Sequence, residues 1–167
     1  MCMNCYHCKT EMNCKKETYH YPESGLENVF LEGVNVCRCD KCGGEAINIP
    51  AIVEMNNRIG KALIRKRALL NGAEIKYLRK NMGFTGKALA EAMHLDNATI
   101  SRWEAGKQKV SESHDILLRL IYCGIKGIPS KDHIEKDFKR SFSDDEISRV
   151  TISSADMDGF PKQPTQA

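Results

Sequence analysis

The sequence predicts an α+β protein of two domains, in which a small strand-rich module precedes an all-α one. Two uneven distributions along the 167 residues separate these modules. Seven of the eight cysteines lie at or before Cys42. The segments 1–50, 51–128 and 129–167 carry net charges of −2, +7 and −2, so the middle segment holds all of the excess positive charge. With 41% hydrophobic residues, the chain can bury a core in each module.

The first module, residues 1–45, is expected to consist of short strands. Its apolar residues are β-branched or aliphatic and are closely spaced, with Pro and Gly as breaks between them: Val29, Leu31, Val34 and Val36, punctuated by Pro22, Gly25 and Gly33. A linking helix is expected within residues 46–72, because apolar residues recur there at helical spacing from Ile52 to Leu70. Pro50 suits its first turn, and Asn71-Gly72 suits its end.

Four further helices are expected in the basic segment, residues 73–128. Their approximate ranges are 73–81, 86–93, 97–105 and 112–122. The remaining residues, 129–167, are polar and rich in Ser and Asp. We expect them to form a flexible tail, apart from a short helix near residues 132–139.

The cysteines of the first module are spaced as in metal sites. Cys5 and Cys8 form one C-x-x-C pair, and Cys39 and Cys42 form a second pair 30 residues later. A hairpin between the pairs would bring four thiolates together around tetrahedral Zn²⁺, and a site closed by four cysteines is structural. The alternative of disulfide exchange is disfavoured because a thioredoxin-like motif would sit within alternating strands and helices.

Other residues of the module leave the ligand assignment open. Cys2 makes a further C-x-x-C with Cys5, and both His7 and His20 are potential ligands. We expect Cys2, Cys14 and Cys37 to be buried hydrophobes or incidental thiols, with an oxidant-sensing or metal-sensing role as the alternative. We expect Cys123, beside Leu120 and Ile121, to pack in a core or a dimer interface.

Residues 85–106 have the pattern of two helices joined by a tight turn. Ile100 and Trp103 mark the inward face of the second helix, with Asp96 as its N-cap and Gly106 as its stop. The opposite face then carries Asn97, Ala98, Ser101 and Arg102. Arg can form two hydrogen bonds to guanine, and Asn can do the same with adenine. Lys87, Lys107 and Lys109 flank this face and can bind phosphates. Gly86 leaves the start of its helix accessible to a phosphate group. This arrangement predicts binding to double-stranded DNA.

Residues 85–106 resemble the Cro/C1-type helix-turn-helix of the XRE family of repressors, whose members often read Ile-Ser-Arg-Trp-Glu-x-Gly as residues 100–106 do. The resemblance implies a five-helix domain in which Arg79 pairs with Glu104. Two positions depart from the family. Gly86 replaces a Gln that commonly helps to contact DNA, and His94 replaces the usual turn Gly.

The order of the modules is similar to that of the MqsA (YgiT-type) antitoxins over residues 3–126. This resemblance implies that Cys5, Cys8, Cys39 and Cys42 bind a structural Zn²⁺ and that Arg102 reads a base. It also implies a homodimer through the C-terminal domain, repression of the protein's own operon at a palindromic operator, and a ribonuclease toxin bound to the zinc module. The base-reading Asn of that family falls on Ala98. The alternative is a stand-alone regulator of the XRE type whose cysteine module senses metal, ligand or oxidant.

Several classes of protein are disfavoured. No run approaches the roughly 18 to 20 apolar residues of a membrane span, and Met1-Cys2-Met3-Asn4 does not resemble a leader, so we expect a cytoplasmic protein. The resemblance to the MqsA-type antitoxins implies that it is bacterial. No Ser-His-Asp set, carboxylate pair or glycine-rich phosphate loop occurs at a usable spacing. We therefore expect no enzymatic activity.

Overall fold

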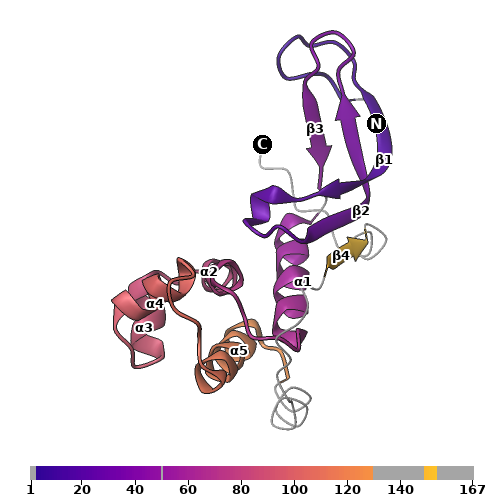
Figure 1. Ribbon diagram of the computed structural model, residues 1–167. Coiled ribbons are helices and arrows are strands. Elements are labelled where there is room, and N and C mark those ends of the chain that lie inside the picture. Colours follow the sequence, from indigo (N-terminus) through magenta and orange to yellow (C-terminus); the bar gives the residue numbers. More distant parts are fainter. Residues whose placement is uncertain (1–2, 50, 130–148, 154–167) are drawn as a thin grey trace. The chain divides into compact units, whose positions relative to one another are not determined.

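The structure is a computed structural model and describes residues 3–49, 51–129 and 149–153 (Figure 1). These residues form two compact units. The first comprises 3–22, 27–49, 51–58 and 149–153, and the second comprises 23–26 and 59–129. A strand-rich module with clustered cysteines is thus followed by a region of five helices, and this confirms the predicted α+β class.

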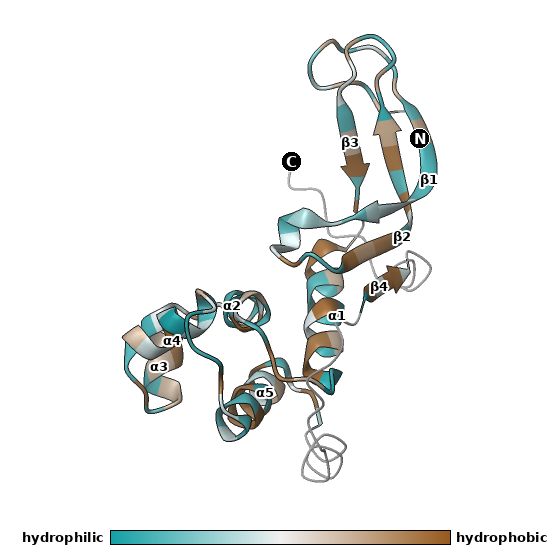
Figure 2. Ribbon diagram, viewed as in Figure 1, coloured by the Kyte–Doolittle hydropathy of each residue, from teal (hydrophilic) through white to brown (hydrophobic). Residues whose placement is uncertain are grey.

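The first unit is built on a four-stranded sheet with β2 at its centre. Its strands are β1 (Asn13–His20), β2 (Val29–Arg38), β3 (Glu45–Asn48) and β4 (Val150–Ser153). β1 and β3 pair with β2 in antiparallel orientation, and β4 pairs with it in parallel orientation. Hydrophobic residues follow one another along β2, whereas β1 is mostly hydrophilic (Figure 2). The predicted apolar set is the core of this sheet, with Val29, Leu31, Val34 and Val36 all at most 2% exposed.

Gly33 does not break the strand as the sequence pattern suggested. The register places Glu17 opposite Val34 but Tyr19 opposite Leu31, so β2 contains one extra residue at this point. Gly33 has φ 69°, a conformation that glycine adopts without steric cost. The resulting bulge keeps Val34 on the same buried face as Leu31, although three positions separate them.

The predicted polar tail also needs correction at residues 150–153. These residues form β4, which pairs with Val29–Glu32 of β2. Val150 and Ile152 alternate with polar residues, and both are buried against the sheet, at 8% and 7% exposed. Two apolar residues in a polar segment are too weak a signal to predict a strand. The short helix expected near residues 132–139 lies outside the described residues.

The helices agree with the predicted ones. They are α1 (Ile52–Arg65), α2 (Gly72–Asn81), α3 (Gly86–Ala92), α4 (Asn97–Glu104) and α5 (Glu112–Lys126). A 3-10 turn spans Pro22–Ser24. Side chains of Asn71, Thr85 and Ser111 accept hydrogen bonds at the starts of α2, α3 and α5. α5 continues beyond the predicted end because Gly127, with φ 62°, is the residue that terminates it.

A buried ionic network fixes α5 within the second unit. The Arg119 guanidinium donates to the Asp115 carboxylate at 2.6 Å and to the carbonyl oxygens of Ile64, Lys66 and Ala68. The same carboxylate accepts from the Leu70 backbone N–H at 2.8 Å. The network satisfies carbonyl groups in the last turn of α1 and in the loop just after it, so burying this charged pair also completes the backbone hydrogen bonding there.

Candidate metal centre and nucleic-acid interface

The two C-x-x-C pairs meet at one end of the first unit. The Sγ atoms of Cys5, Cys8, Cys39 and Cys42 all lie within 4.8 Å of one another. The closest pairs are Cys5 with Cys42 and Cys8 with Cys39, each at 3.4 Å. In a tetrahedral site with Zn–S bonds of about 2.3 Å, the sulfurs are separated by about 3.8 Å. The four sulfurs therefore fit a zinc ion in both chemistry and spacing.

Both cysteine pairs are carried by turns of the same construction. The Lys9 backbone N–H donates to the Cys5 carbonyl, and the Gly43 N–H donates to the Cys39 carbonyl, both at 2.9 Å. The donor residue is left-handed in each turn, with φ 60° at Lys9 and φ 70° at Gly43. The β1–β2 hairpin, from which β2 leads into the second turn, brings these turns together as the spacing predicted.

The electrostatics of the cluster show why it favours a cation. The Thr10 hydroxyl and backbone N–H, together with the Cys39 Sγ atom, lower the pKa of Cys8 to about 6. The backbone N–H of Gly44 lowers the pKa of Cys42, but the three neighbouring sulfurs outweigh it and raise that pKa to about 12. The protein environment thus favours ionisation of one thiol at neutral pH and opposes ionisation of another. A bound dication would stabilise all four as thiolates.

The other cysteines and histidines that the structure describes do not join the cluster. Among the described residues, the potential metal ligands that come together here are the four cysteines alone, so His7 is outside the set. The His20 Nε2 atom is 2.9 Å from the Glu27 carbonyl oxygen. Cys123 is buried, as predicted, at 1% exposed. Cys2 lies outside the described residues.

Cys14 and Cys37 differ in part from the expectation that they are buried hydrophobes or incidental thiols. Cys37 is buried, at 1% exposed, but neither residue is a free thiol. They are opposite each other in the register of β1 and β2 and form a disulfide, with Cα atoms 3.9 Å apart. The sequence separation of 23 residues gave no indication of this pairing, because it depends on the register of the hairpin.

In the second unit, α3 and α4 present the predicted polar face. Asn97, Ala98 and Arg102 are exposed on α4, as are Ser101 on the same helix and the flanking residues Lys87, Lys107 and Lys109. A Cβ atom at Gly86 would lie 2.9 Å from the Asn97 side-chain oxygen. The start of α3 therefore approaches the start of α4 closely, and a larger residue at position 86 would require the exposed Asn97 side chain to shift.

Arg79 of α2 connects α4 to the segment just before α3, through hydrogen bonds to Glu104 and to the Phe84 carbonyl. The Arg79 guanidinium binds the Glu104 carboxylate bidentately, through Nε at 2.5 Å and Nη2 at 3.0 Å, and donates to the Phe84 carbonyl oxygen at 2.8 Å. The pair implied by the resemblance is thus confirmed.

His94 has the left-handed conformation expected of the turn, with φ 54°. Asp96 is the N-cap of α4, although its side chain makes no capping hydrogen bond.

Residues 75–114 match the sequence model of the helix-turn-helix family. They contain most of α2, all of α3 and α4, and the start of α5. No curated protein matches the chain, and no solved structure matches it. Within the described residues, no helix has the length and apolar character needed to cross a membrane.

The family match supports a DNA-binding role for the second unit. The helix-turn-helix is a DNA-binding fold of regulators, in which the second helix of the motif enters the major groove. Here that helix is α4, which carries the exposed polar set. The match and the geometry together support a DNA-binding regulator.

Proposed function

We propose that this protein is a zinc-containing, homodimeric repressor of transcription, and the antitoxin of a type II toxin–antitoxin system that represses its own operon. The observation that carries the proposal is the exposed face of α4 within a segment that matches the helix-turn-helix family. In functional terms, residues 1–45 form the zinc module, 46–72 the link, and 73–128 the DNA-binding domain. Such a protein acts in the bacterial cytoplasm, on double-stranded DNA.

DNA recognition follows from the chemistry of the exposed face. Arg102 is the candidate for a bidentate contact to guanine, and Asn97 for a contact to adenine. Ala98 can contact a thymine methyl group, and Ser101 can bond to either kind of base edge. Lys87, Lys107 and Lys109 provide phosphate contacts around the start of α3 at Gly86.

A homodimer is supported by an apolar stripe on α5. Leu117 and Ile125 are 37% and 52% exposed, with half-buried Ile121 between them at helical spacing. Gly124 lies beside them with open space around its Cβ position, so another helix can approach closely. A two-fold dimer would place two copies of α4 on the two half-sites of a palindromic operator.

The zinc module is the proposed site for a toxin. Residues 1–50 carry a net charge of −2, and four thiolates on one Zn²⁺ contribute a further −2 because the thiols are neutral in that count. A negative module is suited to a basic ribonuclease and is unfavourable for contact with DNA.

The test is binding of the full chain to the DNA upstream of its own gene, measured by fluorescence anisotropy at fixed salt. Replacing exposed Arg102 by Ala should cost about 1 to 3 kcal/mol on that DNA and relax the preference for one base pair. Arg67→Ala is the matched control, since Arg67 is exposed in the second unit but outside α4. Equal losses for the two variants, or unchanged specificity for Arg102→Ala, would refute base reading by Arg102.

A second candidate function rests on the disulfide between Cys14 and Cys37. It is a stand-alone regulator of the XRE type whose cysteine module senses an oxidant. In that case peroxide should release the DNA, a thiol reductant should restore binding, and Cys14→Ser should abolish the response. If peroxide and reductant do not change the DNA affinity, oxidant sensing is refuted and the proposal of a repressor without a redox response remains.

A further inference from the structure

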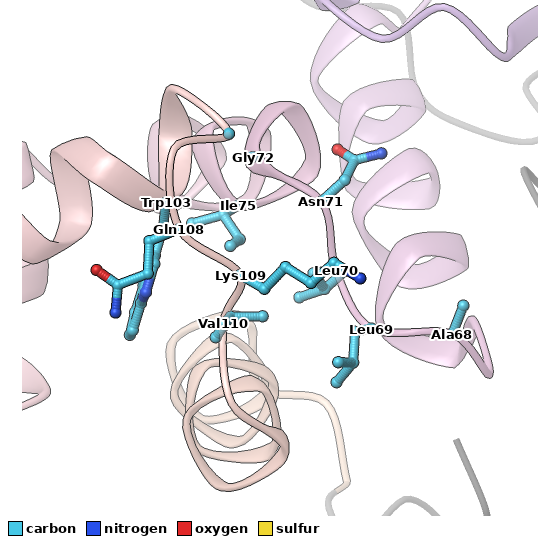
Figure 3. Close-up of a pocket in the computed structure, with 11 residues that line it drawn as sticks. Ala68, Leu69, Leu70, Asn71, Gly72, Ile75, Trp103, Gln108, Lys109 and Val110 are labelled. Atoms are coloured by element: carbon cyan, nitrogen blue, oxygen red, sulfur yellow. The ribbon is translucent and has the colours of Figure 1, made fainter. Parts of the chain in front are cut away.

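A cavity in the second unit lies behind the DNA-facing surface, between the start of α2 and the end of α4. Its volume is about 280 Å³. The walls are formed by Leu70 and Ile75 from the α2 side, by Trp103 of α4, and by Val110 from the loop between α4 and α5. Figure 3 shows these side chains around one space, with Lys109 extending across it toward Leu70. The size suits a ligand with a single ring or a short branched chain.

The apolar wall contains one unsatisfied hydrogen-bond donor. The Trp103 side chain is only 3% exposed, and its Nε1 atom has no hydrogen-bond partner among the described residues. Because buried donors are nearly always paired, this N–H is available to an acceptor that the described residues do not supply. The nitrogen is closed to solvent, so an acceptor must displace part of the wall to reach it. Access to the nitrogen would require a shift of the α4–α5 loop, which forms this part of the wall and has no helix or strand at residues 105–111.

One polar group at the cavity is a cation, and Asn71 and Gln108 add neutral amides to the lining. Lys109 is exposed and makes no ion pair within the described part of the chain, in contrast to Lys66, which binds Glu74 at 2.9 Å. A largely apolar cavity whose polar groups are two amides, one buried N–H donor and one ammonium group has the chemistry to hold an apolar body that ends in a negatively charged acceptor.

We propose that this cavity binds a small aromatic or branched aliphatic carboxylate. The ring or chain packs on Leu70, Ile75 and Val110, and the carboxylate accepts from Trp103 Nε1 and pairs with Lys109. A bound carboxylate holds the Lys109 ammonium group away from a DNA phosphate and thereby weakens DNA binding. That consequence for regulation rests on the proposed function, whereas the binding site does not.

The chain offers a direct probe of binding. Trp103 is its only tryptophan, so a ¹⁵N-labelled sample gives a single indole N–H resonance. Benzoate, added to the full chain without DNA, should shift that resonance downfield in a saturable way. Benzamide, which keeps the ring and the carbonyl but lacks the charge, should bind about threefold more weakly, in line with an exposed ion pair. The absence of a saturable shift with benzoate, or equal affinity for the two compounds, would overturn the proposal.

Two variants locate the site. Val110→Phe fills the cavity and should abolish the shift, whereas Val53→Phe, the same change at an exposed position of α1, should leave it intact. Lys109→Met should remove the preference for benzoate over benzamide without affecting the core, and Lys87→Met should not. Benzoate binding that survives in a folded Val110→Phe chain, or an unchanged preference in Lys109→Met, would place the ligand elsewhere.

The regulatory consequence is measured separately, as the DNA affinity with and without saturating benzoate. Wild-type affinity should fall, and the affinity of Lys109→Met should not respond. If the indole resonance shifts but wild-type DNA affinity stays constant, the proposed regulation is overturned while the site stands. If the chain does not bind the DNA at all, the proposed function fails, and the titration without DNA still decides the site.

Discussion

At the scale of single residues, the Arg79–Glu104 pair holds the helix-turn-helix together. Both side chains are largely buried, at 13% and 14% exposed, and Glu104 raises the pKa of the Arg79 guanidinium through its hydrogen bonds. The pair joins α2 to α4, so it fixes the orientation of the face that is proposed to read DNA.

Replacing Glu104 by Gln should therefore destabilise the second unit. The change keeps the size of the side chain but leaves a buried guanidinium without its counter-ion, and we expect a loss of about 2 to 3 kcal/mol in the free energy of unfolding. Urea denaturation followed by Trp103 fluorescence measures it. Glu91→Gln is the control, because Glu91 is 69% exposed and 3.9 Å from Lys87, and it should cost less than about 0.5 kcal/mol. Similar losses in both variants would contradict the role of the buried pair.

At the scale of secondary-structure elements, the apolar stripe of α5 leads to a prediction about assembly. Ile125→Asp places a charge in the stripe that contains Leu117 and Ile121, and the chain should become monomeric in sedimentation velocity at micromolar concentration. Its affinity for the operator should fall as well, because one copy can occupy only one half-site. Ser113→Asp is the control, because it places the same charge at an exposed position of α5 outside the stripe. This variant should remain dimeric. A dimeric Ile125→Asp chain would move the interface away from α5.

At the scale of the whole molecule, the two compact units predict separate responses to metal removal. A module of about 45 residues has little core, so zinc should supply much of its folding free energy. Cys39→Ser should therefore abolish the dispersed amide resonances of β1–β3 and leave the indole resonance of Trp103 unchanged. Asp40→Ser, an exposed change between the two ligands, should preserve both sets of signals. Full retention of zinc and of the strand resonances in Cys39→Ser would exclude Cys39 as a ligand.

The sequence by itself determined the features that depend on short spacings. Helical periodicity and caps located α1 to α5, and the C-x-x-C pairs identified the four sulfurs that come together. The outward face of α4 followed from its inward residues, Ile100 and Trp103, which are 1% and 3% exposed. Each of these signals lies within a short stretch of consecutive residues, so local sequence patterns are sufficient to predict it.

Only the tertiary structure decided the features that depend on distant partners. The Cys14–Cys37 disulfide and the bulge at Gly33 arise from the register of β2 against β1. β4 forms because Val150 and Ile152 find a strand more than 100 residues earlier in the chain. The left-handed turn at Lys9, the counterpart of Gly43, occurs at a residue type that does not favour this conformation, so the sequence did not predict it. The cavity beside Trp103 exists only where α2, the residues before it, α4 and the α4–α5 loop meet, and such long-range contacts leave no periodic trace in the sequence.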